Sequence, residues 1–339
     1  MKRIIFLFFL LTSCIVSSCC RKPSASLSGG MEYAQWFDLQ EGKIVVRSPF
    51  GAPADTFAVT GALGSVACMS SSCVGFLSAL GCDSVVTAVS GCGYLSDRSV
   101  RERAVEIGYD AALNYEALLK LHPDLLVAYA VSAAEPGYVR TLRDLGIPVL
   151  TIHEHLESHP LARAEYIKLF GALTGREERA DSLFSAIRDR YLERIRTRSR
   201  PVKVLINIPY ADEWYIPGGD NYMTRLISDA GGQVLGAVPG QHASSVISVE
   251  KAYRLSQEAD CWLNPGWCST KDELRSVHPL FSDFPVLEKK VWNNTRQATE
   301  GGGNAFWETG PVCPDVILED LCAIFDGKDG ERTYFIPVL

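Results

Sequence analysis

Short apolar runs alternate with amphipathic segments along most of the chain. In the first half, the runs 65–69, 84–89 and 125–130 predict buried strands, and helical patterns occupy much of the sequence between them. Further along, the same rhythm begins again, with predicted strands at 202–208 and 260–264. Strands that alternate with helices in this way predict parallel sheets covered by helices on both faces.

One amphipathic segment, residues 176–198, separates these two regions. Its apolar residues recur at steps of three and four and therefore share one face of a predicted helix. They are Ala180, Leu183, Phe184, Ile187, Tyr191, Leu192 and Ile195. At about 1.5 Å per residue this helix would be roughly 33 Å long. It is either a surface helix of one large domain or a rigid link between two lobes. The link is favoured because the sequences on both sides show the same alternation of strands and helices.

The predicted fold is therefore α/β, with two Rossmann-like lobes whose parallel sheets are joined by one long α-helix and with a ligand cleft between the lobes. The predicted segments are a signal peptide (1–18), a flexible tether (19–30), an N-terminal α/β lobe (31–159), linker helices (160–199), a C-terminal α/β lobe (200–327) and a C-terminal tail (328–339). The N-terminal lobe opens with a β-hairpin, predicted from runs 33–39 and 43–47 around a Glu-Gly turn signal.

The N-terminus is typical of a targeting segment. Lys2 and Arg3 precede an apolar run, and Val16-Ser17-Ser18-Cys19 then resembles the lipobox of bacterial lipoproteins, in which the cysteine is lipidated. A similar pattern ends at Cys14, and a cleaved secretory signal is the alternative. We predict lipidation of Cys19, which would anchor the mature protein by lipid on the periplasmic side of a bacterial membrane.

Charge and cysteine content argue against some partners and some kinds of site. The formal net charge is −7, whereas a nucleic-acid binder typically carries a basic surface. We therefore predict no nucleic-acid partner. The chain has 11 cysteines but no CxxC pair, which argues against a structural zinc site. An oxidising compartment permits disulfides within each lobe, and Cys268–Cys313 is the expected pair.

Motifs of common enzyme classes are absent from the sequence. There is no GxSxG, no P-loop, no HExxH and no GxGxxG that leads from a strand into a helix. We therefore predict a binding protein rather than an enzyme. An extracytoplasmic metal-cofactor enzyme on the same scaffold, and a surface adhesion or sensor protein, are the alternatives.

Eight short motifs follow one another in a recognisable order. They are VACMSSSCVGFLSALG (66–81), Asn114-Tyr115-Glu116 with LHPD (121–124), GIPV (146–149), LTGREE (173–178), PGGD (217–220), AGG (230–232), HPL (278–280) and the segment 310–315. In these motifs, over about 65–325, the chain resembles the periplasmic substrate-binding proteins of ABC importers for cobalamin, ferric siderophores and haem. Gly75, where many members carry Glu, departs from the pattern, as does the Ser- and Cys-rich segment 68–73.

The resemblance implies a monomer that captures a solute and delivers it to the permease subunits of an ABC transporter. No cofactor is implied, and the ligand would be an iron chelate, haem or cobalamin. Glu116 and Glu250 match the two exposed glutamates, one in each lobe, that dock such proteins onto their transporter. The simpler interpretation is that both acids stabilise the first turn of a helix.

The ligand should bind beyond the carboxyl ends of the strands. The loops expected there are rich in aromatic residues, and the predicted ligand contacts among them are Tyr94, Tyr109, Tyr129, Trp214, Tyr215, Trp267 and Trp307. Such rings suit a flat macrocycle or an aromatic chelate, although packing within a lobe is the alternative for each.

Three polar residues complete the predicted site. Ser70 and Ser72 precede a helix N-terminus, which can hold an anionic group. Arg296 is a candidate partner for an anionic ligand, unless it is simply solvated.

His153, His155 and His159 are candidate metal ligands. However, His153 and His155 share one strand exit, whereas a metal carrier (for Zn or Mn) would draw ligands from both lobes. We predict no metal site and expect solvated hinge residues instead.

Overall fold

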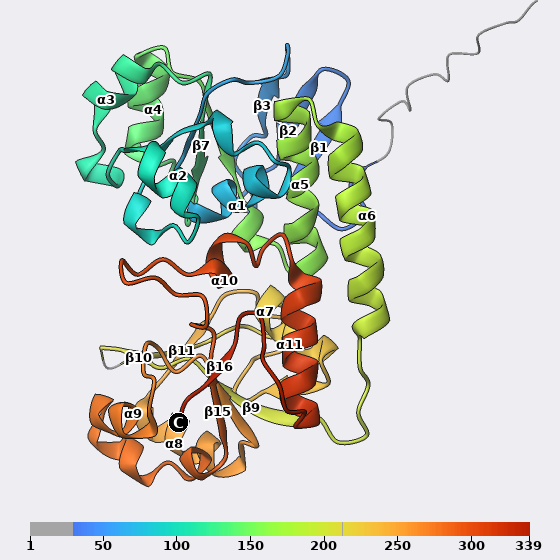
Figure 1. The fold of residues 1–339 in the computed structure, drawn as a ribbon, viewed down its shortest axis with the longest axis vertical. Coiled ribbons are helices and arrows are strands. Elements are labelled where there is room, and N and C mark those ends of the chain that lie inside the picture. The colour runs from blue at the N-terminus through green and yellow to red at the C-terminus, as the bar shows by residue number, and fades with distance from the viewer. Residues whose placement is uncertain (1–29, 212) are drawn as a thin grey trace, which may run out of the picture.

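The computed structural model describes residues 30–211 and 213–339. Two α/β lobes lie one above the other in Figure 1, and a long helix runs along one side from the level of the first to that of the second. The predicted signal peptide and the predicted lipidation site Cys19 lie outside the described residues. Within them, no helix is both long enough and apolar enough to span a membrane.

The N-terminal lobe is built on a five-stranded parallel sheet in the order β6-β5-β4-β7-β8. Its strands are β4 (Val66–Cys68), β5 (Val86–Val89), β6 (Val105–Glu106), β7 (Leu125–Tyr129) and β8 (Val149–Ile152), and its helices are α1 (Ser71–Ala79), α2 (Arg98–Arg103), α3 (Tyr115–Leu121) and α4 (Gly137–Asp144). Leu125 and Val127 of β7 join one hydrophobic cluster, whereas Leu126 and Ala128 join a second on the other face. The strand is apolar throughout because helices cover both faces of the sheet.

A small antiparallel sheet precedes this lobe. The predicted hairpin is confirmed as β1 (Phe37–Gln40) and β2 (Lys43–Val46), and β3 (Asp55–Ala58) adds a strand that was not predicted. The buried carboxylate of Glu165 accepts hydrogen bonds from the backbone N–H groups of residues 32–34. This carboxylate fixes the point where the chain enters the fold.

Two consecutive helices form the linker. α5 (Pro160–Thr174) is almost wholly buried and ends at Gly175, whose φ of 64° is the left-handed conformation that favours glycine at a helix end. α6 (Glu177–Arg194) packs on α5 and on α11 (Pro314–Asp326) of the second lobe. The Tyr191 hydroxyl donates to Asp229 of that lobe at 2.8 Å, so the linker is fixed to both lobes.

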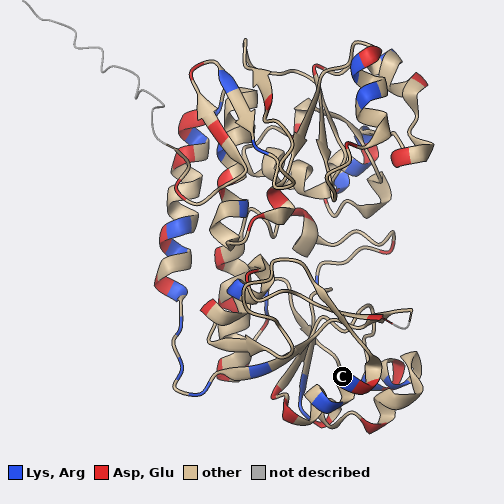
Figure 2. Cartoon of the chain, turned by 180° about the vertical axis from the view of Figure 1, so that it is seen from behind, with Lys and Arg blue, Asp and Glu red and all other residues tan. Residues whose placement is uncertain are grey.

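The amphipathic pattern of the linker is largely confirmed. Four residues of the predicted face, Ala180, Phe184, Ile187 and Tyr191, are buried, and charged side chains of both signs follow α6 in Figure 2. Leu192 is exposed and Ile195 lies beyond the last turn, so these two positions of the predicted face were wrong.

The C-terminal lobe repeats the architecture with the sheet order β12-β9-β14-β15-β16. Its strands are β9 (Val202–Ile206), β12 (Gly232–Val234), β14 (Cys261–Leu263), β15 (Lys290–Asn293) and the antiparallel edge β16 (Ile336–Pro337), and its other helices are α7 (Tyr222–Asp229), α8 (Val249–Glu258), α9 (Lys271–Val277) and α10 (Ala305–Glu308). The segment predicted as a tail thus supplies β16. A second antiparallel sheet, β10 (Pro209–Tyr210), β11 (Glu213–Ile216) and β13 (Ser245–Ile247), was not predicted.

The expected disulfides are not formed. All eight cysteines among the described residues are free, including Cys268 and Cys313. Burial raises the pKa of the Cys73 thiol to about 12 and that of Cys313 to about 11, so these thiols are protonated and pack as small apolar side chains.

Candidate ligand-binding site

Exposed aromatic side chains are concentrated at the carboxyl ends of the strands. Among the described residues, every exposed aromatic ring lies at or beyond the end of a strand and before the next long helix. These residues are Tyr94, Tyr109, Tyr129, Tyr210, Tyr215, Trp267 and Trp307. Six of the seven predicted aromatic contacts are therefore accessible to a ligand, and Tyr210 joins them.

Trp214 is the exception, and its prediction as a ligand contact was wrong. Its ring is 0 % exposed and stacks between Trp262, at 5.7 Å, and Phe284, at 6.1 Å. Its indole N–H donates to the Ile206 carbonyl at 2.8 Å. Because β11 alternates between its two faces, Trp214 points into the core and the adjacent Tyr215 points out.

Two tyrosines of the N-terminal lobe form one part of the candidate site. Tyr94 and Tyr109 meet edge to face with ring centroids 6.2 Å apart. Gly91, with a φ of 80°, allows this approach because a Cβ there would overlap both rings. Burial opposes ionisation of Glu106, but hydrogen bonds from Gly91, Gly108 and Cys92 hold its pKa below the ordinary value. Glu106 therefore fixes the loop that carries Tyr94.

A buried ionic network joins α1, the segment after β8, and α5. The Ser72 hydroxyl and the Arg163 guanidinium donate to opposite oxygens of Glu154, each at 2.8 Å. Burial raises the pKa of Glu154, but the Arg163 charge and the hydrogen bonds from Arg163 and Ser72 together lower it, and the net pKa lies below the ordinary value. Arg163 also lies over the ring of Tyr222, 4.1 Å from its centroid. The network therefore connects α1, α5 and the second lobe.

This network changes the interpretation of the serine turn. Ser72 is buried and its hydroxyl is occupied by Glu154, while Ser70 contacts Ser72 at 2.8 Å. Ser72 thus holds a carboxylate of the protein itself. Sequence reasoning missed Glu154 and Arg163, although charged residues inside the apolar segment that becomes α5 were a signal for a buried ion pair.

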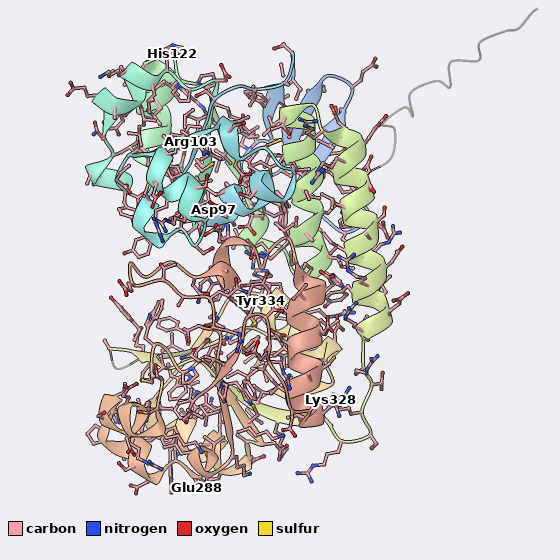
Figure 3. All side chains as sticks on the ribbon, viewed as in Figure 1. Asp97, Arg103, His122, Glu288, Lys328 and Tyr334 are labelled. Atoms are coloured by element: carbon pink, nitrogen blue, oxygen red, sulfur yellow. The ribbon has the colours of Figure 1, made fainter. Side chains whose placement is uncertain are left out.

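A glycine-rich segment and α10 bring the two lobes into contact. Cβ atoms at Gly301 and Gly303 would lie 2.7 Å from the carbonyl oxygens of Gly93 and Tyr94, so only glycine allows this approach. The Glu308 carboxylate accepts hydrogen bonds from the backbone N–H groups of Ser96 and Asp97. Figure 3 labels Asp97 on the side of the first lobe that faces the second.

α10 also explains the unusual glycine of α1. A Cβ at Gly75 would overlap the backbone carbonyl oxygen of Glu308, so the two helices pack with their backbones in direct contact. Trp307 is exposed beside this contact, at the edge of a small cavity of about 20 Å³ that Arg163 and Tyr222 also line. That space is about the size of one water molecule.

Arg296 lies against the end of the chain. Its guanidinium is 2.9 Å from the Glu331 carboxylate, and its backbone N–H donates to Tyr334, which Figure 3 labels in the second lobe. A ligand that recruited Arg296 would compete with this ion pair.

The three histidines are not solvated, which corrects the expectation from sequence. His153 is buried, and burial lowers its pKa to about 4. His159 accepts the Leu161 N–H as the cap of α5, and burial lowers its pKa to about 4 as well. His155 contacts Tyr129 edge to face at 5.8 Å. No group of three or more His, Cys, Asp or Glu in the described part of the chain could hold a metal ion.

Both predicted docking glutamates are exposed in the first turn of a helix. Glu116 lies in α3, which Asn114 caps at 3.0 Å, and Glu250 lies in α8, which Ser248 caps at 3.3 Å. Figure 1 shows one of these helices in each lobe. The position fits docking and helix stabilisation equally well.

Two parallel-sheet lobes on a helical linker, with aromatic strand ends, define a two-lobed solute-binding protein. Residues 66–291 match the family model described as periplasmic binding protein, and the chain belongs to that family. This confirms the resemblance seen in the motifs, and the family consists of solute-binding proteins rather than enzymes.

Similar proteins agree with this assignment. An uncharacterized lipoprotein of Methanocaldococcus jannaschii is 24 % identical over 243 residues, which is 69 % of this chain, and the chain spans only 56 % of that relative. A periplasmic haem binding protein from Pseudomonas aeruginosa has a TM-score of 0.63 at 17 % identity, over 82 % of this chain and 98 % of that structure. A triscatecholate siderophore binding protein from Bacillus subtilis has a TM-score of 0.61 at 18 % identity, over 81 % and 96 %.

Proposed function

We propose that this protein is the solute-binding component of an ABC importer and captures a ring-bearing solute of the iron chelate, haem or cobalamin type. The observation that carries the proposal is the location of the exposed aromatic rings. They occur at the strand ends of both lobes, which is where ligands of open parallel sheets bind.

The chemistry of these positions supports capture rather than catalysis. Tyr and Trp offer large rigid contact areas with little loss of side-chain entropy, and each keeps a polar group for orientation. Two acids near the strand ends are held by other groups of the protein, since Glu154 is paired with Arg163 and Glu308 binds backbone N–H groups. Binding and release would then leave the solute unchanged.

Lipid attachment at Cys19 is the second part of the proposal. It is supported by the lipobox pattern and by the lipoprotein relative, and it would keep the protein beside its transporter outside the cytoplasm. The intact mass of the mature N-terminus tests it. Lipid on Cys14 would correct the site, and an unlipidated N-terminus would end this part of the proposal.

The test of solute binding is purification of the protein from its own host, followed by mass and visible absorption spectra of what it retains. We expect one solute per chain, released intact on denaturation and restored by titration. Conversion of the solute into another compound by the purified protein would contradict the proposal. So would the absence of any solute together with no thermal shift from ferric chelates, haem or cobalamin.

A further inference from the structure

Basic residues are nearly absent from the loops at the strand ends. The chain has 33 Lys and Arg residues, yet only one of them, Arg296, lies in the described loops that lead from a strand to the next helix, and it is paired with Glu331. The same loops carry several exposed acids, among them Asp110, Asp220 and Glu300. A polyanionic solute would meet no free cation on this surface.

A cavity in the N-terminal lobe is likewise lined by acids and contains no basic residue among those that the structure describes. It has a volume of about 590 Å³ and lies between the loops that follow β6 and β7 and the start of α4. Three tyrosines and two acids line it, and none of its lining residues is basic. We call it the tyrosine pocket, and the five residues are Asp110, Tyr115, Tyr129, Glu135 and Tyr138.

One of the two carboxylates in the tyrosine pocket has no positively charged partner in the described part of the chain. Glu135 is neutralised by Arg143 at 2.6 Å, whereas Asp110 forms no ion pair and its carboxylate accepts no hydrogen bond from any residue that the structure describes. Asp110 also has a φ of 31°, a strained backbone conformation for a residue other than glycine. Burial and the Asp110 charge both raise the pKa of Tyr129 and Tyr138, so the rings stay neutral phenols beside one free carboxylate.

We propose that the tyrosine pocket binds a substituted ammonium group carried by the transported solute. Aromatic faces attract cations through their quadrupole, and the Asp110 carboxylate supplies the opposite charge. Tyr129 belongs both to this pocket and to the exposed aromatic residues of the candidate site, and Asp110 directly follows Tyr109, so the pocket borders that site. The proposal rests on the proposed solute-binding function and narrows it to a solute that presents a cation to the first lobe.

The test compares choline with 3,3-dimethylbutan-1-ol, which has the same shape without the charge. Calorimetric titration of the whole mature protein should show choline binding at least about tenfold more tightly. Asp110→Asn should weaken choline binding by about tenfold and leave the neutral alcohol unchanged. Asp144→Asn, an exposed acid of α4 with no ion pair among the described residues, is the matched control and should change neither.

Each outcome is decisive for one of the two proposals. Equal affinity for choline and the alcohol, or an Asp110→Asn variant that binds choline normally, would overturn the ammonium proposal. If the protein nevertheless retains a solute from its host, and that solute lacks a cationic group, the solute-binding function stands and only the present inference fails. If choline binds as expected but no solute is retained or bound, the pocket exists and the transport function fails.

Discussion

Trp214 and Trp267 lie in one lobe but in opposite environments. Trp214 is fully buried among aromatic rings, whereas Trp267 is 62 % exposed beyond the end of β14. Trp214→Ala should lower the free energy of unfolding by about 3–5 kcal/mol, because it opens a large cavity. Trp267→Ala should leave folding nearly unchanged and weaken solute binding by about 1–3 kcal/mol.

Denaturant unfolding and calorimetry of both variants check this pair of predictions. The two variants serve as controls for each other, since one probes the core and the other the site. Normal solute affinity in Trp267→Ala would remove this ring from the site, and normal stability in Trp214→Ala would contradict the described core.

Glu157 should make stability depend on pH. Burial raises the pKa of this carboxyl from 4.5 to about 7 in the folded protein, so between these values the folded state holds a proton that the unfolded chain has released. The stabilisation is complete below pH 4.5 and is lost as the pH rises through 7, a change of about 3 kcal/mol.

Glu157→Gln tests this directly because the amide keeps the oxygen that accepts the Gln35 and Trp36 N–H groups. Unfolding at pH 5 and pH 8 should show a smaller pH dependence in the variant than in the native chain. Identical pH dependence of the two proteins would show that Glu157 does not titrate in this range.

At the scale of residues, the loop aromatics could be predicted because neighbouring Gly and Pro place them outside regular apolar periods. The prediction for Trp214 was wrong, because Glu213-Trp214-Tyr215-Ile216 alternates as a short strand does and so turns Trp214 into the core. The roles of Ser72 and Arg163 depend on Glu154, which reaches them only through the fold. Such contacts between distant positions leave no local pattern in the sequence.

At the scale of elements, the linker and α10 should restrict motion between the lobes. α6 packs on both α5 and α11, and Glu308 binds the backbone of the first lobe. Bending a continuous helix breaks its internal hydrogen bonds, so we expect only a small change in the radius of gyration when the solute binds. Small-angle X-ray scattering with and without solute measures it, and a large compaction would contradict a rigid linker.

Long helices and buried strands could be predicted because their periodicity and end signals agree. End signals act locally, as in α9, which begins at Lys271 because Thr270 and Glu273 form a capping box. The second antiparallel sheet, with its two-residue strand β10, and the edge strand β16 were missed. Strands this short carry no periodicity and exist only because a partner strand completes their hydrogen bonds.

At the scale of the whole molecule, the two exposed glutamates should serve delivery rather than capture. Glu116→Arg combined with Glu250→Arg should leave solute affinity nearly unchanged and abolish uptake, because exposed charges govern association and orientation more than folding. Transport of labelled solute by cells that carry the variant measures this effect.

The control is Glu41→Arg combined with Glu178→Arg, which changes the net charge equally at exposed sites away from α3 and α8. It should transport normally. Normal uptake by the Glu116 and Glu250 variant, or equal loss in the control, would show that these glutamates are not specific docking points.

Hydrogen exchange with and without the co-purified solute tests the central claim most directly, because it reports where the solute contacts the chain. We expect protection in the strand-end loops of both lobes, around Tyr94, Tyr109, Tyr129, Tyr215 and Trp267, and unchanged exchange in α8. Protection confined to one lobe, or to surfaces away from the strand ends, would contradict it.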